Sequence, residues 1–310
     1  MIQETAMTVR LLLHVLLLAG LSPLLLGVIT RTKAIIAGRQ GAPLWQPYRD
    51  LRRLFGKEMV LSSTTTWVFR AGPVVGIAVP LLAALLIPFG AIGAPLSFAG
   101  DLVLFVYLFG LARFFTVLAA LDTGSSFEGM GAAREATFSC LAEPTIFVAF
   151  IVLARISGSL TLDTMFSTLF ANHLQTVYGV SLLLTAICLF VILLVENCRI
   201  PFDDPTTHLE LTMIHEVMVL DHSGPDFGLI LYGAAMKLMV MGTLVVNFVM
   251  PPATGSLAMD AALYVAALLA LAVGVGLVES AMARLRLLKV PQLLIGTTLL
   301  SFFALVLLLR

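Results

Sequence analysis

The sequence predicts an all-α integral membrane protein with about eight transmembrane helices. Of its 310 residues, 60% are hydrophobic and only 12% are charged, and the mean hydropathy is +1.05. A soluble domain carries about 25% charged residues, so these few charges cannot cover a water-exposed surface. The apolar residues also fall into runs of the length that crosses about 30 Å of hydrocarbon, which takes about 20 residues of helix. Lipid must therefore be the solvent for most of the chain.

The apolar runs predict a single membrane domain over residues 1–310. We expect each run to be a helix, because every backbone amide at membrane depth must be hydrogen-bonded within the protein. No small-residue cleavage site follows the first run, which therefore reads as a retained helix rather than a signal peptide. The predicted spans cover residues 8–29, 68–92, 100–121, 136–158, 176–195, 227–250, 260–283 and 291–309.

Basic residues are distributed unevenly between the predicted loops. The loops on the opposite side contain no Lys or Arg, and such an asymmetry places the basic loops in the cytoplasm. Both termini are then expected outside, and the loop between spans five and six is cytoplasmic and acidic. The basic loops contain Arg31, Lys33, Arg39, Arg49, Arg52, Arg53, Lys57, Arg70, Arg134, Arg199, Arg284, Arg286 and Lys289.

Acidic residues gather in the same predicted cytoplasmic loops. A solvated loop accounts for Glu128, Asp204 and Asp226. The segment from Asp203 to Met218 instead predicts an apolar helix with polar interruptions, which must be enclosed by protein on several sides. The other acidic residues of the loops after spans three and five are Asp122, Glu135, Glu196, Asp203, Glu210, Glu216 and Asp221, and the segment also contains His208 and His215.

The sequence predicts no metal site in this chain. Its three cysteines form no CxxC pair, so it cannot hold an iron–sulfur cluster or a structural zinc by itself. After His215 and Glu216, Val219 stands where an HExxH zinc motif needs its second histidine. Any redox metal must lie in a partner subunit. The net charge of zero gives no argument for nucleic acid as a partner.

Five charged residues fall within predicted spans: Arg113, Glu143, Arg155, Lys237 and Glu279. A charge at the bilayer centre costs ~2.5–3.5 kcal/mol, so such groups normally have a charged partner or line a water-filled path. Arg155 is close enough to an outer helix end to reach the interface. The other four residues could form structural ion pairs or belong to a proton path. A proton path is possible because buried carboxylates can hold a proton near neutral pH.

Longer motifs resemble the complex I subunit 1 family. Residues 39–58 are similar to the loop and amphipathic helix after the first span of that subunit. Residues 122–125, 131–136, 143–144 and 279–286 resemble the hydrogenase branch, which includes formate hydrogenlyase subunit 4 and the membrane subunits of energy-converting group 4 NiFe hydrogenases. Residues 196–224 resemble the acidic loop that meets the redox module in both branches.

Two departures from the family pattern stand out. The loop around Arg39 is compact, which speaks against a standard quinone enzyme. The run Asp221-His222-Ser223-Gly224 replaces a common Glu-Tyr-Ser-Gly, and a histidine there could titrate near neutral pH.

The resemblance implies a membrane-anchoring, ion-coupling subunit of a respiratory-type redox complex in the cytoplasmic (inner) membrane, with no catalytic residues or cofactors of its own. A NiFe centre and Fe-S clusters are expected in partner subunits. These partners are hydrogenase-like large and small subunits, an Fe-S protein and antiporter-like membrane subunits. By residue match, proton or ion coupling is assigned to Glu135, Glu143, Glu196, Asp203, His208, Glu210, Asp221, Lys237 and Glu279. The interface with the peripheral arm is assigned to Arg39, Gln46, Asp50, Arg134, Glu216 and His222.

Three alternatives stay open at this stage. The chain could be the quinone-site subunit of a complex I-type NADH dehydrogenase, with spans one and six and the Arg39 loop enclosing a quinone tail. It could be a stand-alone ion or solute transporter. It could also serve a related complex whose hydrogenase-like partner has lost its nickel ligands.

Overall fold

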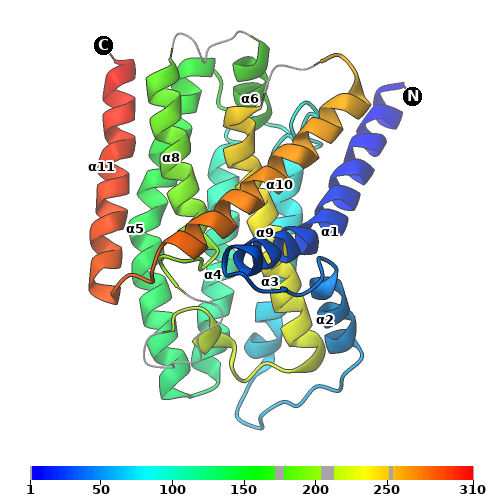
Figure 1. The fold of residues 1–310 in the computed structure, drawn as a ribbon, viewed down its shortest axis with the longest axis vertical. Helices are drawn as coiled ribbons and strands as arrows, with labels where there is room; N and C mark the ends of the chain where they lie inside the picture. The colour runs from blue at the N-terminus through cyan, green and yellow to red at the C-terminus, as the bar shows by residue number, and fades with distance from the viewer. Residues whose placement is uncertain (1, 172–177, 204–212, 251–253, 310) are drawn as a thin grey trace.

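The computed structural model describes residues 2–171, 178–203, 213–250 and 254–309 as a bundle of helices without a strand (Figure 1). Eight of these helices are long and apolar enough to cross a membrane. The predicted fold class is therefore confirmed. The spanning helices are α1 (Ile2–Ile36), α3 (Trp67–Leu86), α4 (Asp101–Asp122), α5 (Ser126–Ser157), α8 (Gly179–Glu196), α9 (Gly224–Val249), α10 (Leu257–Ala281) and α11 (Val290–Leu308).

Within the described residues, four shorter elements lie between the spanning helices. The amphipathic helix α2 (Gln46–Phe55) follows α1, and α6 (Leu162–Ala171) is a helix that the hydropathy pattern did not predict. Two 3-10 turns, η1 (Glu216–Val219) and η2 (Leu287–Lys289), precede α9 and α11. The start of α1 and the end of α11 lie at one end of the bundle, whereas α2 and η1 lie toward the other end (Figure 1). We call the end with α2 and η1 the loop end; that it is cytoplasmic stays a prediction.

Helix α1 extends beyond its predicted span of 8–29 at both ends, and α3 and α5 differ from their predicted bounds for local reasons. Helix α5 begins at Ser126 rather than at 136, so Glu128 and Glu135 lie on a helix and not in a loop. Helix α3 ends at Leu86 rather than at 92, because Pro88 forces the preceding Ile87 into an extended conformation.

The helix predicted between Asp203 and Met218 is wrong in its described part. Residues 213–215 are not helical, and only the single 3-10 turn η1 follows. His208 and Glu210 lie outside the described residues. The sequence pattern failed here because apolar residues with polar interruptions also suit a loop that is enclosed by protein.

Helices α3 and α9 approach closely at Gly233. A Cβ atom added to Gly233 would lie 2.5 Å from the carbonyl oxygen of Gly76. Backbone cannot yield as a flexible side chain can, so Gly233→Ala is expected to cost about 1–3 kcal/mol through overpacking. Thermal unfolding of the purified chain in detergent measures the loss. Gly274→Ala on α10 is the matched control, because nothing lies within 4 Å of its added Cβ. Equal melting temperatures for the two variants would contradict the prediction.

Candidate functional site

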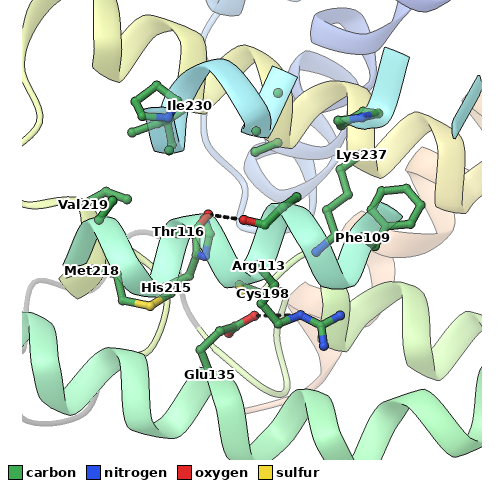
Figure 2. A pocket seen from close by; sticks show the side chains of 18 of the residues that line it. Phe109, Arg113, Thr116, Glu135, Cys198, His215, Met218, Val219, Ile230 and Lys237 are labelled. Carbon is green, nitrogen blue, oxygen red and sulfur yellow. Dashed lines mark hydrogen bonds and ion pairs between the residues drawn. The ribbon is translucent and has the colours of Figure 1, made fainter. Parts of the chain in front are cut away.

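Charged side chains from four helices meet inside the bundle, around a cavity of about 100 Å³ (Figure 2). Helix α4 contributes Arg113, α5 contributes Glu135, α8 contributes Glu196 and α9 contributes Lys237. Each of these helices is otherwise apolar over most of its length, so the charged positions can be stable only by meeting one another.

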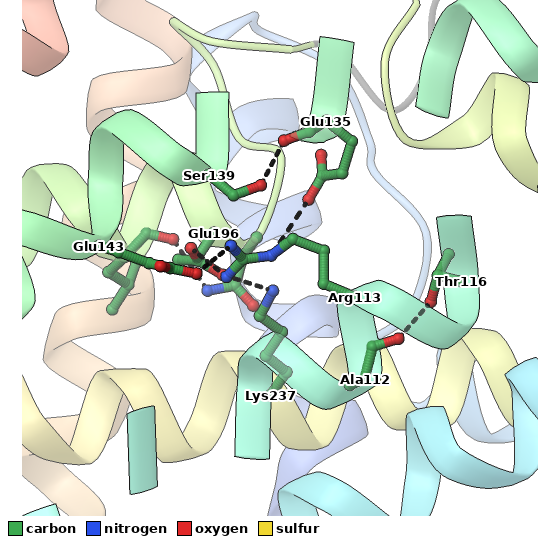
Figure 3. Close-up of polar contacts among 10 residues, drawn as sticks. Ala112, Arg113, Thr116, Glu135, Ser139, Glu143, Glu196 and Lys237 are labelled. Atoms are coloured by element: carbon green, nitrogen blue, oxygen red, sulfur yellow. Dashed lines mark hydrogen bonds and ion pairs between the residues drawn. The ribbon is translucent and has the colours of Figure 1, made fainter. Parts of the chain in front are cut away.

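Arg113 is the centre of this charged group (Figure 3). Its Nη1 lies 3.1 Å from Glu143 Oε1, and its Nη2 lies 3.0 Å from Glu196 Oε1. Its Nε lies 3.9 Å from Glu135 Oε1. The second oxygen of Glu196 lies 2.8 Å from Lys237 Nζ. We call these five residues the central cluster.

The central cluster contains one more carboxylate than it has cations. The Glu196 side chain is 2% exposed and lies between both cations, whereas the Glu143 side chain is 38% exposed at the edge of the bundle. An unbalanced charge is costly in a medium of low dielectric constant. The cluster is therefore suited to hold one exchangeable proton, or a cation, in addition to its own ion pairs.

A second group of ion pairs lies between α1, α10 and the loop after α8. The fully buried carboxylate of Glu279 lies 2.8 Å from Lys33 Nζ and 3.4 Å from Arg199 Nη1. Asp203 Oδ1 lies 2.8 Å from Arg284 Nη2. These five residues form what we call the loop-end cluster. Its imbalance is opposite to that of the central cluster, since it has three cations and two carboxylates.

Asp203 also holds the chain before η1 in place. Its Oδ2 accepts hydrogen bonds from the backbone N–H groups of Ile214, at 3.0 Å, and His215, at 3.3 Å. A carboxylate that binds an arginine and two backbone donors fixes the position of this segment. A movement of the segment would therefore change the surroundings of Asp203 directly.

A larger cavity of about 900 Å³ lies between α1, α2, α9 and the segments on both sides of η1. Its lining includes apolar side chains such as Ile29 and Ile230 and charged side chains such as Asp203 and Glu279. Cys198, His215 and His222 line both this cavity and the smaller one, so the two spaces adjoin there. Polar walls of this kind can hold ordered water, and the two clusters thus border adjoining spaces.

The two histidines beside these cavities are neutral at pH 7. Burial lowers the pKa of His222, whose ring stacks on Phe69 at 3.8 Å, to about 4. Burial, followed by the nearby Lys237, lowers the pKa of His215 to about 4. Burial raises the pKa of the Cys198 thiol well above its usual value. The expectation that His222 titrates near neutral pH is therefore wrong.

The lowered pKa of His222 makes the stability of the chain depend on pH. The unfolded chain takes up this proton near pH 6.5 and the folded chain near pH 4. The contribution of His222 to the free energy of unfolding is therefore fully present above pH 6.5. It is lost as the pH drops from 6.5 toward 4, by up to about 1.4 kcal/mol per pH unit. His222→Phe keeps a ring against Phe69 and should show a smaller loss. Melting temperatures at pH 7 and pH 5 measure this; an equal loss in both chains would contradict it.

The structure brings six of the residues assigned to coupling into the two clusters. Glu135, Glu143, Glu196 and Lys237 belong to the central cluster, whereas Asp203 and Glu279 belong to the loop-end cluster. Asp221 is exposed and belongs to neither. Arg113, which joins three carboxylates, was not assigned to coupling, although its place within a predicted span was a signal.

The residues assigned to the interface are dispersed at and near the loop end. Arg39 is exposed, and Gln46 donates a hydrogen bond to Asp50 Oδ1 at 2.9 Å. Arg134 donates to the carbonyl oxygen of Met213 at 2.7 Å. Glu216 is half-buried beside the larger cavity, whereas His222 is only 7% exposed and lies inside the chain. Their contact with a partner stays a prediction.

Glu128 was expected to be solvated, and this expectation is wrong. The residue is 1% exposed and accepts a hydrogen bond from the backbone N–H of Asp221 at 3.2 Å. It therefore ties the start of α5 to the turn before α9.

Comparison with known proteins agrees with this architecture. Residues 8–309 match the family model described as NADH dehydrogenase. Formate hydrogenlyase subunit 4 of Escherichia coli (strain K12) is 32% identical over 91% of this chain and 92% of that protein. Hydrogenase-4 component C of the same organism is 34% identical over 77% of this chain and 74% of that protein. NADH-ubiquinone oxidoreductase chain 1 of Triticum aestivum is 28% identical over 72% of this chain and 70% of that protein.

A solved structure shows the same fold. It is a chain from the structure of the membrane-bound sulfane sulfur reductase, an archaeal respiratory membrane complex. The two chains superpose with a TM-score of 0.82 at 21% identity, over 97% of this chain and 99% of the other. The resemblance carried by the sequence motifs is confirmed, and the chain belongs to the NADH dehydrogenase family of complex I subunit 1-like membrane proteins.

Proposed function

We propose that this chain is the membrane-anchoring, ion-coupling subunit of an energy-converting hydrogenase or formate-hydrogenlyase-like complex. The observation that carries the proposal is the set of three carboxylates joined by Arg113 inside an apolar bundle. The two relatives named as parts of formate hydrogenlyase and hydrogenase-4 support the type of complex.

The proposed coupling begins at the loop end. A partner that moves the chain around Ile214 and His215 would change the hydrogen bonds to Asp203 and its pairing with Arg284. That alters the electrostatic field at the central cluster, where the excess carboxylate exchanges a proton. Glu143, at the edge of the bundle, would then pass the proton or a sodium ion toward the neighbouring membrane subunit.

We assign the NiFe centre and the Fe-S clusters to hydrogenase-like large and small subunits and an Fe-S protein, docked at the loop end. Antiporter-like subunits would lie beside Glu143, and the whole complex would lie in the inner membrane. The three cysteines of this chain, which form no CxxC pair, cannot hold an iron–sulfur cluster, and this supports the assignment of the clusters to partner subunits.

Glu143→Gln tests the proposed function. The exchange keeps the shape of the side chain and a weak acceptor for Arg113, so the complex should assemble and transfer electrons. Ion translocation in inside-out vesicles should fall at least about tenfold, which corresponds to about 1.4 kcal/mol. Glu58→Gln, at an exposed carboxylate at the loop end, is the matched control. Full translocation by assembled Glu143→Gln would refute the proposal.

The larger cavity favours a second candidate, a quinone-site subunit. Its volume of about 900 Å³ and the apolar side chains that α1 and α9 contribute to its lining suit an isoprenoid tail. These two helices are spans one and six, which the quinone alternative from the sequence places around such a tail. Quinone extracted in a one-to-one ratio from the purified complex would support this candidate. A complex that turns over without quinone, and carries none, would exclude it.

A further inference from the structure

Three metal-ligating side chains meet where the two cavities adjoin. One ligand atom each from Glu135, Cys198 and His215 lies within 4.8 Å of the others. The three residues come from α5, the turn after α8 and the chain before η1, and Figure 2 shows them around one space. Because they are far apart in the sequence, the absence of an HExxH motif could not reveal or exclude this arrangement.

Two of the three ligand groups, Cys198 and His215, have no other hydrogen-bond partner within the described part of the chain. No hydrogen bond there involves the Cys198 thiol or the His215 ring, and both side chains border the cavities. The nearest cation to Glu135 Oε1 is Arg113 Nε at 3.9 Å, which is too far for a hydrogen bond. The 900 Å³ cavity, which reaches Cys198 and His215, supplies an access path for an ion.

The backbone holds Cys198 in an unusual conformation that keeps its thiol in this place. Its φ of 50° lies in the left-handed region, which non-glycine residues rarely adopt. The turn is fixed by hydrogen bonds from the backbone N–H of Cys198 to Val195 and from that of Arg199 to Leu194, at 3.0 and 2.8 Å. This pair of hydrogen bonds is the Schellman motif that ends α8, and its left-handed position is usually a glycine rather than a cysteine.

The charge balance also favours a divalent cation. The central cluster contains the cations Arg113 and Lys237 and three carboxylates, which leaves one negative charge in excess. A divalent ion that binds Cys198 as a thiolate adds two positive charges and one negative charge. The cluster then becomes neutral, and the thiol proton leaves through the cavity.

We propose that Glu135, Cys198 and His215 bind a borderline divalent cation of the zinc class, with water as the fourth ligand. One thiolate, one imidazole and one carboxylate suit zinc rather than magnesium or calcium. Bonds of about 2.0–2.3 Å in a tetrahedral site separate ligand atoms by roughly 3.3–3.8 Å. Ligand atoms that lie within 4.8 Å of one another would close by at most roughly 1.5 Å to reach this geometry, which small changes in their χ angles would provide. Zinc bound here would remove Glu135 from proton exchange and so inhibit coupling.

Cobalt tests the site, because a thiolate bound to Co²⁺ gives a charge-transfer absorption in the near ultraviolet. The full-length chain, reconstituted in lipid nanodiscs, should bind Co²⁺ one to one with this absorption, and Zn²⁺ should remove it. Cys198→Ser should abolish the absorption, and His215→Gln should weaken binding at least tenfold. Cys140→Ser, at an exposed cysteine, is the control and should bind as the unaltered chain does. No absorption in the unaltered chain, or equal absorption in Cys198→Ser, would overturn the proposal.

Zinc content provides a second measurement that does not depend on activity. After equilibration with Zn²⁺, the assembled complex should hold one more zinc per chain than the complex with Cys198→Ser. The complex with Cys140→Ser should match the unaltered one. Equal zinc contents in all three complexes would also overturn the proposal, whether or not the chain couples ion movement.

Discussion

Glu196→Gln is expected to stop coupled ion movement and to destabilise the chain by about 3–5 kcal/mol. The two carboxylate oxygens of Glu196 bind different cations, Arg113 at 3.0 Å and Lys237 at 2.8 Å. A glutamine has only one acceptor oxygen, so one cation would keep its charge inside the bundle without a partner at Glu196. Removing one member of a buried ion pair is costly for this reason, whereas an exposed pair contributes little.

Thermal unfolding in detergent and ion translocation in inside-out vesicles measure the two effects of Glu196→Gln. Glu58→Gln is again the matched control, because Glu58 is exposed. A melting temperature and a translocation rate equal to those of the unaltered chain would show that Glu196 has neither role.

Arg113→Met is expected to have the second large effect. The exchange leaves Glu135, Glu143 and Glu196 with Lys237 as the only remaining cation of the central cluster. We expect at least about a tenfold loss of translocation and a destabilisation of about 3 kcal/mol or more. Arg113→Lys should restore only part of both, because a lysine is a single point charge and cannot reach several carboxylates with a planar fork.

A double-mutant cycle separates pairing from other effects of Arg113→Met. If Arg113 and Glu196 stabilise each other, the double variant Arg113→Met with Glu196→Gln should lose less stability than the sum of the two single losses. Unfolding free energies of the four chains give the coupling. Strictly additive losses would contradict the pairing.

The helical spans could be predicted from the sequence because hydropathy is a local property. The length and hydropathy of each apolar run can be read directly from the sequence. Basic residues between the runs, such as Arg52 and Arg53, add a prediction of which side of the membrane each connection faces. Boundaries were less certain where a helix continues past the hydrocarbon. Helix α5 extends back to Ser126 through polar residues such as Glu128, which a hydropathy pattern cannot distinguish from a loop.

The site could be predicted only in part, because pairing is a property of the folded bundle. The intramembrane positions of Glu143, Lys237 and Arg113 indicated that charges must meet, but 83 residues separate Arg113 from Glu196 along the chain. Family motifs identified the acidic members of the clusters. No sequence motif links Cys198, His215 and Glu135, because they are far apart in the chain. They come together only through the packing of α5 against the turn before α9.

In the proposed function, redox chemistry in a docked partner changes the proton occupancy of carboxylates in the central cluster. Infrared difference spectra of the assembled complex, oxidised minus reduced, measure this directly through the C=O stretch of protonated carboxyl groups. We expect a redox-dependent carboxyl band that is lost or shifted in Glu135→Gln or Glu143→Gln and retained in Glu58→Gln. A spectrum without such a band, or a band unchanged in every variant, would contradict it.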